Sequence, residues 1–536
     1  MDNLSLLGKK WVLPQDNSGG DFLARLRKIR GIDASEIHAG EAMCDLQKAA
    51  ERITQAIEDK EKILVVGDYD ADGITASAIL FKTIQHLGGT VSVRLPHRIH
   101  DGYGLNQKFI EEAKKLGVKL IVTVDNGISA CAEVELANSL GMDVIVTDHH
   151  TPPAKLPRAF AIVNPKRKDC KYPDKNLSGA AVALKLAEHL GELPEDLRNE
   201  LYALAAIGTL ADVCPLTGEN RALVAMGLEA LPKIQNVGLR KILANAGVHG
   251  GKISAEDIGF RVAPRINAAG RLDDPLMAFQ AIANGSGEKY ADELERLNRE
   301  RQDWTAKTLA EIEERLGELG TEKILIASGD FHPGIIGLAA GNLAEKYFRP
   351  AIVMSRREGK LVGSCRSPLA EFDITAALAA SADLLEKFGG HRGAAGFTVS
   401  EANRPEFEKQ LSDFAEKNIE QIELTPQLEL DLEVGEKDLT EKFLSELNSL
   451  APFGAGNPEP NLLWRDAPLA EVRAIGEDGK HLKLGVGTNK LAAIAFGFGE
   501  FADELGKRGR ADLVFNFGEN AWNGSRELQL KIIDAR

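Results

Sequence analysis

Residues 63–73, ILVVGDYDADG, constrain the fold of this chain more than any other stretch. The apolar, mostly β-branched start predicts a buried strand that a glycine ends. Asp68, Asp70 and Asp72 follow, directly before a helical pattern at 74–87. Carboxylates crowded after a strand repel one another unless a cation lies among them, and oxygen ligands of this kind suit Mg²⁺ or Mn²⁺. The alternative interpretation is an acidic turn in which an aspartate caps the helix.

Apolar runs alternate with helical patterns along the chain that follows, which predicts an α/β domain with a mostly parallel sheet. Asp125 comes directly after the apolar run at 120–124, and Asp148, His149 and His150 come directly after the run at 144–147. The carboxyl ends of parallel strands meet at one edge of a sheet, where sites form in open α/β folds. Three strands that deliver acids and histidines to one edge therefore predict a metal site.

A fourth acid, Asp212, follows a helix of small residues in the stretch GTLADVCPL. Taken alone, Asp212 is most simply an acid in a loop after a helix. Residues 176–190, NLSGAAVALKLAEHL, predict a helix with Ser178 as its N-cap. The backbone amides at the start of that helix could also receive an anion.

The length, net charge, cysteine spacing and apolar runs of the chain limit the classes of protein to which it can belong. A chain of 536 residues is long enough for three or four domains. Its net charge of −15 argues mildly against a nucleic-acid partner, but only the charge of the binding groove matters to a bound strand. The five cysteines form no CxxC pair, no apolar run approaches the ~20 residues of a membrane span, and the N-terminus lacks an apolar signal core. We therefore expect a cytoplasmic protein without a membrane association.

The middle of the chain predicts helices and a second α/β domain. Residues 261–274, RVAPRINAAGRLDD, predict a glycine- and proline-punctuated loop that carries Arg265, Asn267 and Arg271. A long charged helix without glycine or proline until Gly317 predicts a spacer between domains. We expect the second α/β domain, which like the first should have a parallel sheet, to begin at KILIAS.

Two features of that second domain suggest anion binding. Arg366, flanked by serines such as Ser364, is a plausible phosphate clamp. His391 stands in the glycine-rich stretch GGHRGAAGF, for which we expect a loop that approaches a ligand closely.

From about residue 425 short alternating strands predict a small β-barrel, most simply an OB-fold. Trp522 offers a stacking face for a base, or else packs at the end of the barrel.

Four stretches in this order, DYDADG, VDNG, TDHH and LADVCPL, resemble the acidic motifs of the DHH phosphoesterase superfamily. Nearly the whole chain resembles one branch of it, the RecJ single-strand-specific DNA exonucleases, through PHRIHDGYG, RVAPRINAAGRLDD, GSCRSP, GGHRGAAGF and APFGAGNPEP. The resemblance implies an N-terminal lead-in at 1–45, a DHH catalytic domain at 46–218, a helical region with a connecting helix at 219–320, a DHHA1-like domain at 321–420 and an OB-fold domain at 425–536.

The resemblance also implies a metal-dependent 5′→3′ exonuclease that hydrolyses single-stranded DNA to mononucleotides in DNA repair and recombination. Two Mn²⁺ or Mg²⁺ ions are expected. Their ligands would come from Asp68, Asp70, Asp72, Asp125, His149 and Asp212, with Asp148 and His150 completing the catalytic set. Which acid binds which ion stays open. Substrate would be bound by Arg98, Asn267, Arg271, Ser364, Arg366, His391 and Trp522.

Two other functions compete with this one. A DHH enzyme that acts on short oligonucleotides or cyclic dinucleotides would generally be shorter and lack the barrel. A non-catalytic replication scaffold would have lost several of the acids that this chain retains. There is no GxxxxGK[ST] loop, so an ATP-driven motor is not indicated. We expect a monomer whose possible protein partners are a single-strand-binding protein or a helicase.

Overall fold

The computed structural model describes residues 4–13, 22–30, 32, 37–249, 251, 253–283, 287–317, 320–420, 422–522 and 525–536, without the side chains of 521, 522 and 525. The chain divides into two compact units. The larger one comprises Ala34–Ile422 and Gly454–Gly456. The smaller one comprises Met1–Asp33, Glu423–Phe453 and Asn457–Arg536.

The larger unit begins with an all-parallel sheet, as the alternation of apolar runs and helical patterns predicts. Its strand order is β3-β2-β4-β5-β6, so the order reverses at β2 and β4. That reversal is a topological switch point, where open α/β sheets form their sites. The strands are β2 (Lys62–Val66), β3 (Thr90–Arg94), β4 (Val118–Val124), β5 (Asp143–Thr147) and β6 (Ala161–Val163).

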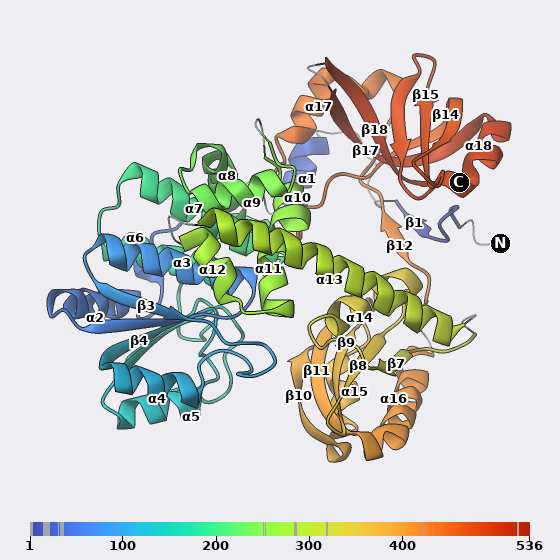
Figure 1. Cartoon of the computed structure of the whole chain (residues 1–536). Coiled ribbons are helices and arrows are strands. Elements are labelled where there is room, and N and C mark those ends of the chain that lie inside the picture. Colours follow the sequence, from blue (N-terminus) through green and yellow to red (C-terminus); the bar gives the residue numbers. More distant parts are fainter. Residues whose placement is uncertain are drawn as a thin grey trace. The chain divides into compact units, whose positions relative to one another are not determined.

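Helices cover both faces of this sheet (Figure 1). Because both faces are covered, β2 and β4 are almost wholly buried, which explains their continuous apolar runs. One face packs against α2 (Leu46–Glu58), α3 (Ala71–His86), α6 (Gly179–Leu190) and α7 (Glu195–Ala211), and the other against α4 (Gln107–Leu116) and α5 (Cys131–Ser139).

A helical region follows, and it leads into the long helix α13 (Gly287–Leu316). Near its start, helix α13 packs against α9 (Val237–Asn245), α11 (Ala263–Leu272) and α12 (Leu276–Ala283). It also contacts α14 (Ile336–Tyr347) of the second α/β domain, so it connects the helical region to that domain as expected (Figure 1). The other helices are α8 (Gly218–Ala230), α9 (Val237–Asn245), α10 (Ala255–Asp257), a π-helical turn at Ile258–Val262, α11 (Ala263–Leu272) and α12 (Leu276–Ala283).

The loop expected at 261–274 is wrong, because most of it is helix α11. Pro264 stands in the first turn of α11, where no backbone N–H is needed. Gly270 is required by close packing rather than by a turn, since a Cβ there would lie 2.1 Å from the carbonyl oxygen of Tyr69. Pro264 and Gly270, which suggest a loop in the sequence, therefore belong to a helix that packs tightly against the acidic stretch around Tyr69.

The second α/β domain has a five-stranded sheet of order β10-β11-β9-β8-β7. The α/β character is as predicted, but only β7 and β8 are parallel as a parallel sheet requires, and the other three strand pairs are antiparallel. The elements are β7 (Leu325–Gly329), α14 (Ile336–Tyr347), β8 (Ala351–Arg357), β9 (Lys360–Arg366), α15 (Ile374–Ala379), β10 (Leu385–His391), β11 (Ala394–Ser400) and α16 (Arg404–Ile419).

The glycine-rich loop expected around His391 is also wrong. His391 ends strand β10, which pairs with β11 in a tight hairpin. Three glycines of this stretch lie within paired strands, where Gly389 stands opposite Gly396 and Gly390 opposite Ala395, and Gly393 lies in the turn between the strands. Because glycine has no side chain, the backbone of both strands is accessible from the faces of the sheet at these positions.

The C-terminal unit is a closed barrel, which confirms the predicted OB-type fold. The sheet order β13-β14-β15-β16-β18-β17 closes because β14 also pairs with β17. The barrel elements are β13 (Leu432–Glu433), α17 (Glu441–Asn448), β14 (Leu462–Ile475), β15 (His481–Val486), β16 (Leu491–Ala495), α18 (Ala502–Arg508), β17 (Arg510–Trp522) and β18 (Ser525–Ala535), and β12 (Gln427–Glu429) precedes them in a separate two-stranded sheet.

The start of the chain packs on this barrel. Strand β1 (Lys10–Val12) pairs in parallel with β12, and Trp11 Nε1 donates a hydrogen bond to the buried Asp534 at 3.0 Å. Helix α1 (Phe22–Arg30) packs beside Leu450. Across the described residues, no helix has both the length and the apolar character that crossing a membrane requires.

Candidate active site

The loop between β2 and α3 presents the first three acids. Asp70 caps α3, because its Oδ1 accepts hydrogen bonds from the amides of Asp72 and Gly73 at 3.1 Å each. The helix-cap interpretation is therefore correct for Asp70, and it leaves the second carboxylate oxygen for other partners. Asp68 is buried, with 3% of its surface exposed. The amide of Ala71 donates to Asn267 Oδ1 at 2.8 Å, so α11 holds this loop in place.

Asp72 lies at the N-terminus of α6. Its two oxygens accept hydrogen bonds from the amides of Gly179 and Ala180 at 2.6 and 2.9 Å. Ser178 is the N-cap, as predicted, because its Oγ accepts from the amide of Ala181. The anion that these amides receive is thus a carboxylate of the chain itself. Gly179 is required here, since a Cβ would lie 2.5 Å from Cβ of Asp125.

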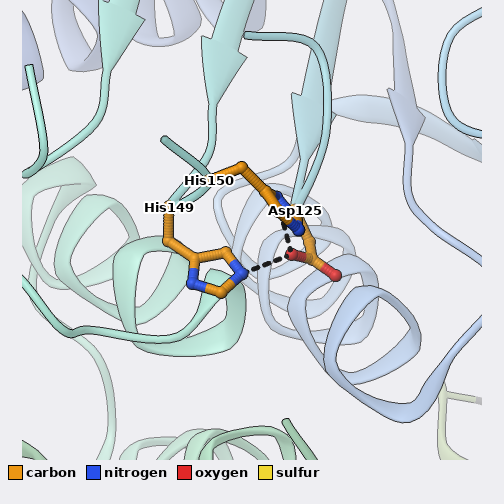
Figure 2. Close-up of side chains that lie close together, drawn as sticks. All are labelled: Asp125, His149 and His150. Carbon is orange, nitrogen blue, oxygen red and sulfur yellow. Dashed lines mark ion pairs between the residues drawn. The ribbon is translucent and has the colours of Figure 1, made fainter. Parts of the chain in front are cut away.

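Asp125, His149 and His150 meet at the carboxyl ends of β4 and β5 (Figure 2). Asp125 has a left-handed backbone, with φ of +60°, and is 3% exposed. Its Oδ1 lies 3.1 Å from His149 Nε2 and 3.9 Å from His150 Nδ1. Asp212 ends α7, and its Oδ2 lies 3.8 Å from His149 Nε2. The structure therefore brings together the four acidic stretches that the sequence places far apart.

Asp148 positions this cluster through its own hydrogen bonds. Its Oδ1 accepts from the amides of His149 and His150, and its Oδ2 accepts from the amide of Ile128 at 2.9 Å. Oδ1 also lies 2.8 Å from His150 Nδ1. Burial opposes the charge on His150, but this contact outweighs burial and raises the pKa of His150 to about 9. The contact with Asp148 therefore favours the protonated form of His150.

The electrostatics of the cluster fit a bound cation. Burial, followed by repulsion from neighbouring carboxylates, raises the pKa of Asp68, Asp72 and Asp125 well above the usual value. Burial lowers the pKa of His149, so its ring is neutral and can act as a ligand. Within the described part of the chain, the buried atoms Asp68 Oδ1, Asp125 Oδ1 and His149 Nε2 have no hydrogen-bond partner. Such atoms are costly unless they coordinate an ion.

The candidate ligands form overlapping sets. Asp125 belongs both to a set with Asp68 and Asp70 and to a set with the two histidines, and the donor atoms within each set lie within 4.8 Å of one another. His149 also belongs to a set with Asp212 and Cys214. Sets that share Asp125 and His149 are compatible with two neighbouring ions. Carboxylate and imidazole donors suit Mn²⁺ or Mg²⁺.

A cavity of about 900 Å³ opens beside the cluster, between the first and second α/β domains of the larger unit. This volume is in the range of ligand sites. One wall carries aromatic and charged side chains, and the other carries the glycine-rich strands β9, β10 and β11. The lining includes Tyr69, Arg98, Tyr103, His150, Gly363, Lys387, Phe388, Gly389 and Gly396.

Three arginines predicted to bind substrate gather at the acidic loop and α14. The guanidinium of Arg98 lies 3.9 Å from the ring centre of Tyr69, and its Nε donates to the carbonyl of Gly270. Arg271 Nη1 donates to the carbonyl of Gly334 at 3.4 Å. Burial, together with the charge of Arg98 and other arginines, lowers the pKa of Arg271 to about 9. Arginines whose positive charges repel one another in this way are stabilised by an anion bound between them.

Ser364 and Arg366 come to this region from β9. Arg366 Nη1 donates to Ser364 Oγ at 3.1 Å and to the carbonyl of Cys365 at 2.7 Å. Burial and the charge of Arg98 act to lower the pKa of Arg366. Both side chains border Gly337 in the first turn of α14, because a Cβ on Gly337 would lie 3.2 Å from Ser364 Oγ and 3.3 Å from Arg366 Nη2. A helix N-terminus and a guanidinium together make a strong anion site.

The other predicted substrate residues have different positions. Asn267 uses its side-chain oxygen to hold the acidic loop. His391 lies on the same face of its sheet as Arg366, because both stand opposite Ala394, but it is exposed and outside the cavity lining. The side chain of Trp522 lies outside the part that the structure describes.

Sequence reasoning missed three side chains at the site. Tyr69 stands between two of the acids and supports Arg98. The hydroxyl of Tyr103 donates to the carbonyl of Asp125 at 3.0 Å, and Cys214 Sγ lies 3.1 Å from Asp212 Oδ2. All three stand within the DYDADG, PHRIHDGYG and LADVCPL stretches, so their positions inside the motifs were the available signal.

Family models match three segments of the chain. Residues 62–209 match the N-terminal domain of the DHH family, residues 321–417 match the DHHA1 domain, and residues 430–534 match the RecJ OB domain. These segments correspond to the parallel sheet with its helices, the second α/β domain and the barrel.

Curated relatives match along most of the chain. The single-stranded-DNA-specific exonuclease RecJ of Bacillus subtilis is 37% identical over 96% of this chain and 68% of its own length. RecJ of Thermus thermophilus is 36% identical over 92% of this chain and 71% of its own length. A solved structure of RecJ from Thermus thermophilus in complex with Mn²⁺ superimposes with a TM-score of 0.84, at 31% identity, over 98% of this chain and 79% of that chain.

Proposed function

Because the chain belongs to the RecJ family of single-stranded-DNA-specific exonucleases, we propose that it hydrolyses single-stranded DNA to mononucleotides from the 5′ end, in DNA repair and recombination. One observation carries the proposal. Buried carboxylates and a neutral histidine leave donor atoms without partners at the switch point of the sheet, beside a cavity and a group of arginines. A phosphodiester needs both features, since cations and arginines must face its charge.

Asp68, Asp70, Asp72, Asp125, His149 and Asp212 would hold two Mn²⁺ or Mg²⁺ ions. Two such ions, when bound, activate a water and stabilise the charge on the attacking and leaving oxygens. Solved structures of the RecJ relative from Thermus thermophilus are complexes with Mn²⁺ and with Mg²⁺. The protein's own contribution is orientation. Asp72 is held by the α6 amides, and Asp70 is held by the first turn of α3.

His150 and Asp148 act together on the phosphate. Asp148 holds the proton on His150 Nδ1, which leaves Nε2–H as the other donor of the ring. His150 lines the cavity, so its positive charge can stabilise the phosphate as negative charge grows in the transition state. It can also donate a proton to the leaving oxygen. His149, by contrast, is neutral and buried, which suits a ligand.

The direction of digestion would come from the arginine group. A terminal phosphate carries more charge than an internal diester, so Arg98, Arg271 and Arg366 favour it. The first turn of α14 and Ser364 add donors to the same place. A 5′-phosphate held there would put the first diester bond at the acidic cluster, which explains release of single nucleotides.

The barrel would hold the rest of the strand, with Trp522 as a stacking face for a base. We also propose that the protein acts as a cytoplasmic monomer that receives its substrate from a single-strand-binding protein or a helicase. Light scattering during size-exclusion chromatography tests the monomer, because a mass of about twice 57.9 kDa would contradict it.

The test of the function is hydrolysis of DNA labelled at either end, in single-stranded and duplex form, with Mn²⁺, Mg²⁺ or a chelator. We expect the 5′ label to appear at once as a mononucleotide, from single strands alone and never with chelator. Preferential cleavage of dinucleotides or cyclic dinucleotides would favour the small-substrate alternative. An absence of any hydrolysis with either metal would favour a scaffold.

A further inference from the structure

Cys214 lies at the edge of the acidic cluster, next to a proposed metal ligand. The chain makes a sharp turn after α7, where Val213 has φ of +55°, a conformation that β-branched residues rarely adopt. This turn leaves Val213 69% exposed and places Cys214 inside, at 7% exposure. Cys214 Sγ donates a hydrogen bond to Asp212 Oδ2 at 3.1 Å. The strained turn therefore brings a thiol and a carboxylate to the same point.

His149 provides the third donor. Its Nε2 is buried and, among the described residues, has no hydrogen-bond partner, and the residue is 6% exposed. Nε2 lies 3.8 Å from Asp212 Oδ2, and the nitrogen, oxygen and sulfur atoms all lie within 4.8 Å of one another. Ligands about 2.0–2.3 Å from a tetrahedral ion are separated by roughly 3.3–3.8 Å. The three atoms need small side-chain adjustments to meet that geometry.

We propose that His149, Asp212 and Cys214 form a zinc site at which Zn²⁺ displaces the ions of the hydrolytic centre and inhibits the enzyme. One nitrogen, one oxygen and one sulfur ligand, with water in the fourth position, form a donor set that zinc prefers. The soft sulfur disfavours Mg²⁺ and Mn²⁺, and zinc generally binds such ligands more tightly than manganese. When the ion binds, the S–H bond breaks, the proton passes to solvent and a Zn–S bond forms.

This inference extends the proposed function, because His149 and Asp212 would serve both kinds of ion. Inhibition follows from that sharing, since a zinc ion on Asp212 and His149 removes two ligands from the hydrolytic pair. Hydrolysis should therefore persist only where Zn²⁺ does not compete with the hydrolytic ions for His149 and Asp212.

The first test does not depend on activity. Co²⁺ replaces Zn²⁺ in such sites, and ligation by a thiolate produces an intense sulfur-to-cobalt charge-transfer band in the near ultraviolet. Metal-free full-length protein titrated with Co²⁺ should develop the band with one thiolate per chain. Cys214→Ser should lose it, whereas Cys44→Ser, which changes a thiol outside the cluster, should keep it. A wild-type protein without the band, or a band that survives Cys214→Ser, would overturn the proposal.

The second test measures inhibition of Mn²⁺-dependent hydrolysis by added Zn²⁺, each variant being compared with its own rate without zinc. The concentration for half-inhibition should rise roughly tenfold or more in Cys214→Ser and stay constant in Cys44→Ser. An unchanged value in Cys214→Ser contradicts the competition. If Cys214→Ser fails to fold by circular dichroism, Cys214→Ala is measured in the same two ways. Failure of the nuclease assay leaves the cobalt result standing, so the two proposals are tested separately.

Discussion

Removal of the Arg366 side chain should weaken recognition of a 5′-phosphate selectively. Arg366 uses Nη1 on Ser364 Oγ and Cys365 O, which fixes the plane of the guanidinium and leaves its other nitrogens for a ligand. A charge-assisted hydrogen bond contributes roughly 1.5–3 kcal/mol, and 1.4 kcal/mol is a factor of about ten. Arg366→Ala should therefore lower kcat/KM for 5′-phosphorylated strands by about 10–150-fold. Arg366→Lys should recover only part of this, because an ammonium cannot form the planar fork.

The assay is single-turnover digestion of one oligonucleotide that carries either a 5′-phosphate or a 5′-hydroxyl. Strands with a 5′-hydroxyl should lose less than about threefold, since they make no such contact. Arg357→Ala, which removes an exposed cation at the end of β8 in the same domain, is the matched control and should change neither rate. Equal losses on both kinds of strand in Arg366→Ala would refute the reasoning and assign Arg366 to general backbone binding.

Three further predictions concern the acidic cluster, the barrel and a buried ion pair. Asp125→Asn should abolish hydrolysis while the melting temperature is kept or raised, because the buried carboxylates lose one repulsive neighbour; a calorimetric scan beside the nuclease assay checks both. A chain that ends at residue 422 should bind long single strands at least about tenfold more weakly in fluorescence anisotropy yet still cut very short oligonucleotides, because the barrel supplies grip rather than chemistry. Lys185→Met should lower the free energy of unfolding in urea by about 3–5 kcal/mol, because the buried Glu219 would lose the cation whose Nζ lies 2.6 Å from its carboxylate and keep only the hydrogen bonds from Tyr172 and the His38 amide. An unchanged midpoint would contradict this.

The acids of the site could be predicted because local signals and topology agree. Each follows an apolar run or helix, and parallel strands place their carboxyl ends together. The sheet order β3-β2-β4 then puts Asp68 and Asp125 at the switch point. The barrel could be predicted from its succession of short alternating strands, and the connecting helix from a long charged stretch without glycine or proline until Gly317.

The features that could not be predicted depend on contacts between residues far apart in the sequence. Pro264 and Gly270 indicate a loop locally, but contact with the carbonyl of Tyr69 decides for a helix. The roles of Asp72 and Asp148 depend on amides from α6 and from the loop after β4, which no local pattern reveals.

The glycines around His391 also need their strand partners to be understood. Their spacing resembles that of a ligand-binding loop, whereas in the sheet they leave backbone open beside the cavity. Cys214 was missed although it stands inside the LADVCPL stretch, because a single cysteine without a CxxC partner does not indicate a metal site by its spacing. Its importance depends on the turn at Val213, which also carries Asp212, and on His149 from the end of β5.

The most direct test of the metal centre is anomalous diffraction at the manganese edge from crystals of the full-length protein grown with Mn²⁺. The account predicts two peaks about 3.5–4 Å apart. They should lie among Asp68, Asp70, Asp72, Asp125, His149 and Asp212, with His150 outside the coordination spheres. No peak in this cluster, or manganese bound elsewhere in a protein that hydrolyses DNA, would contradict it.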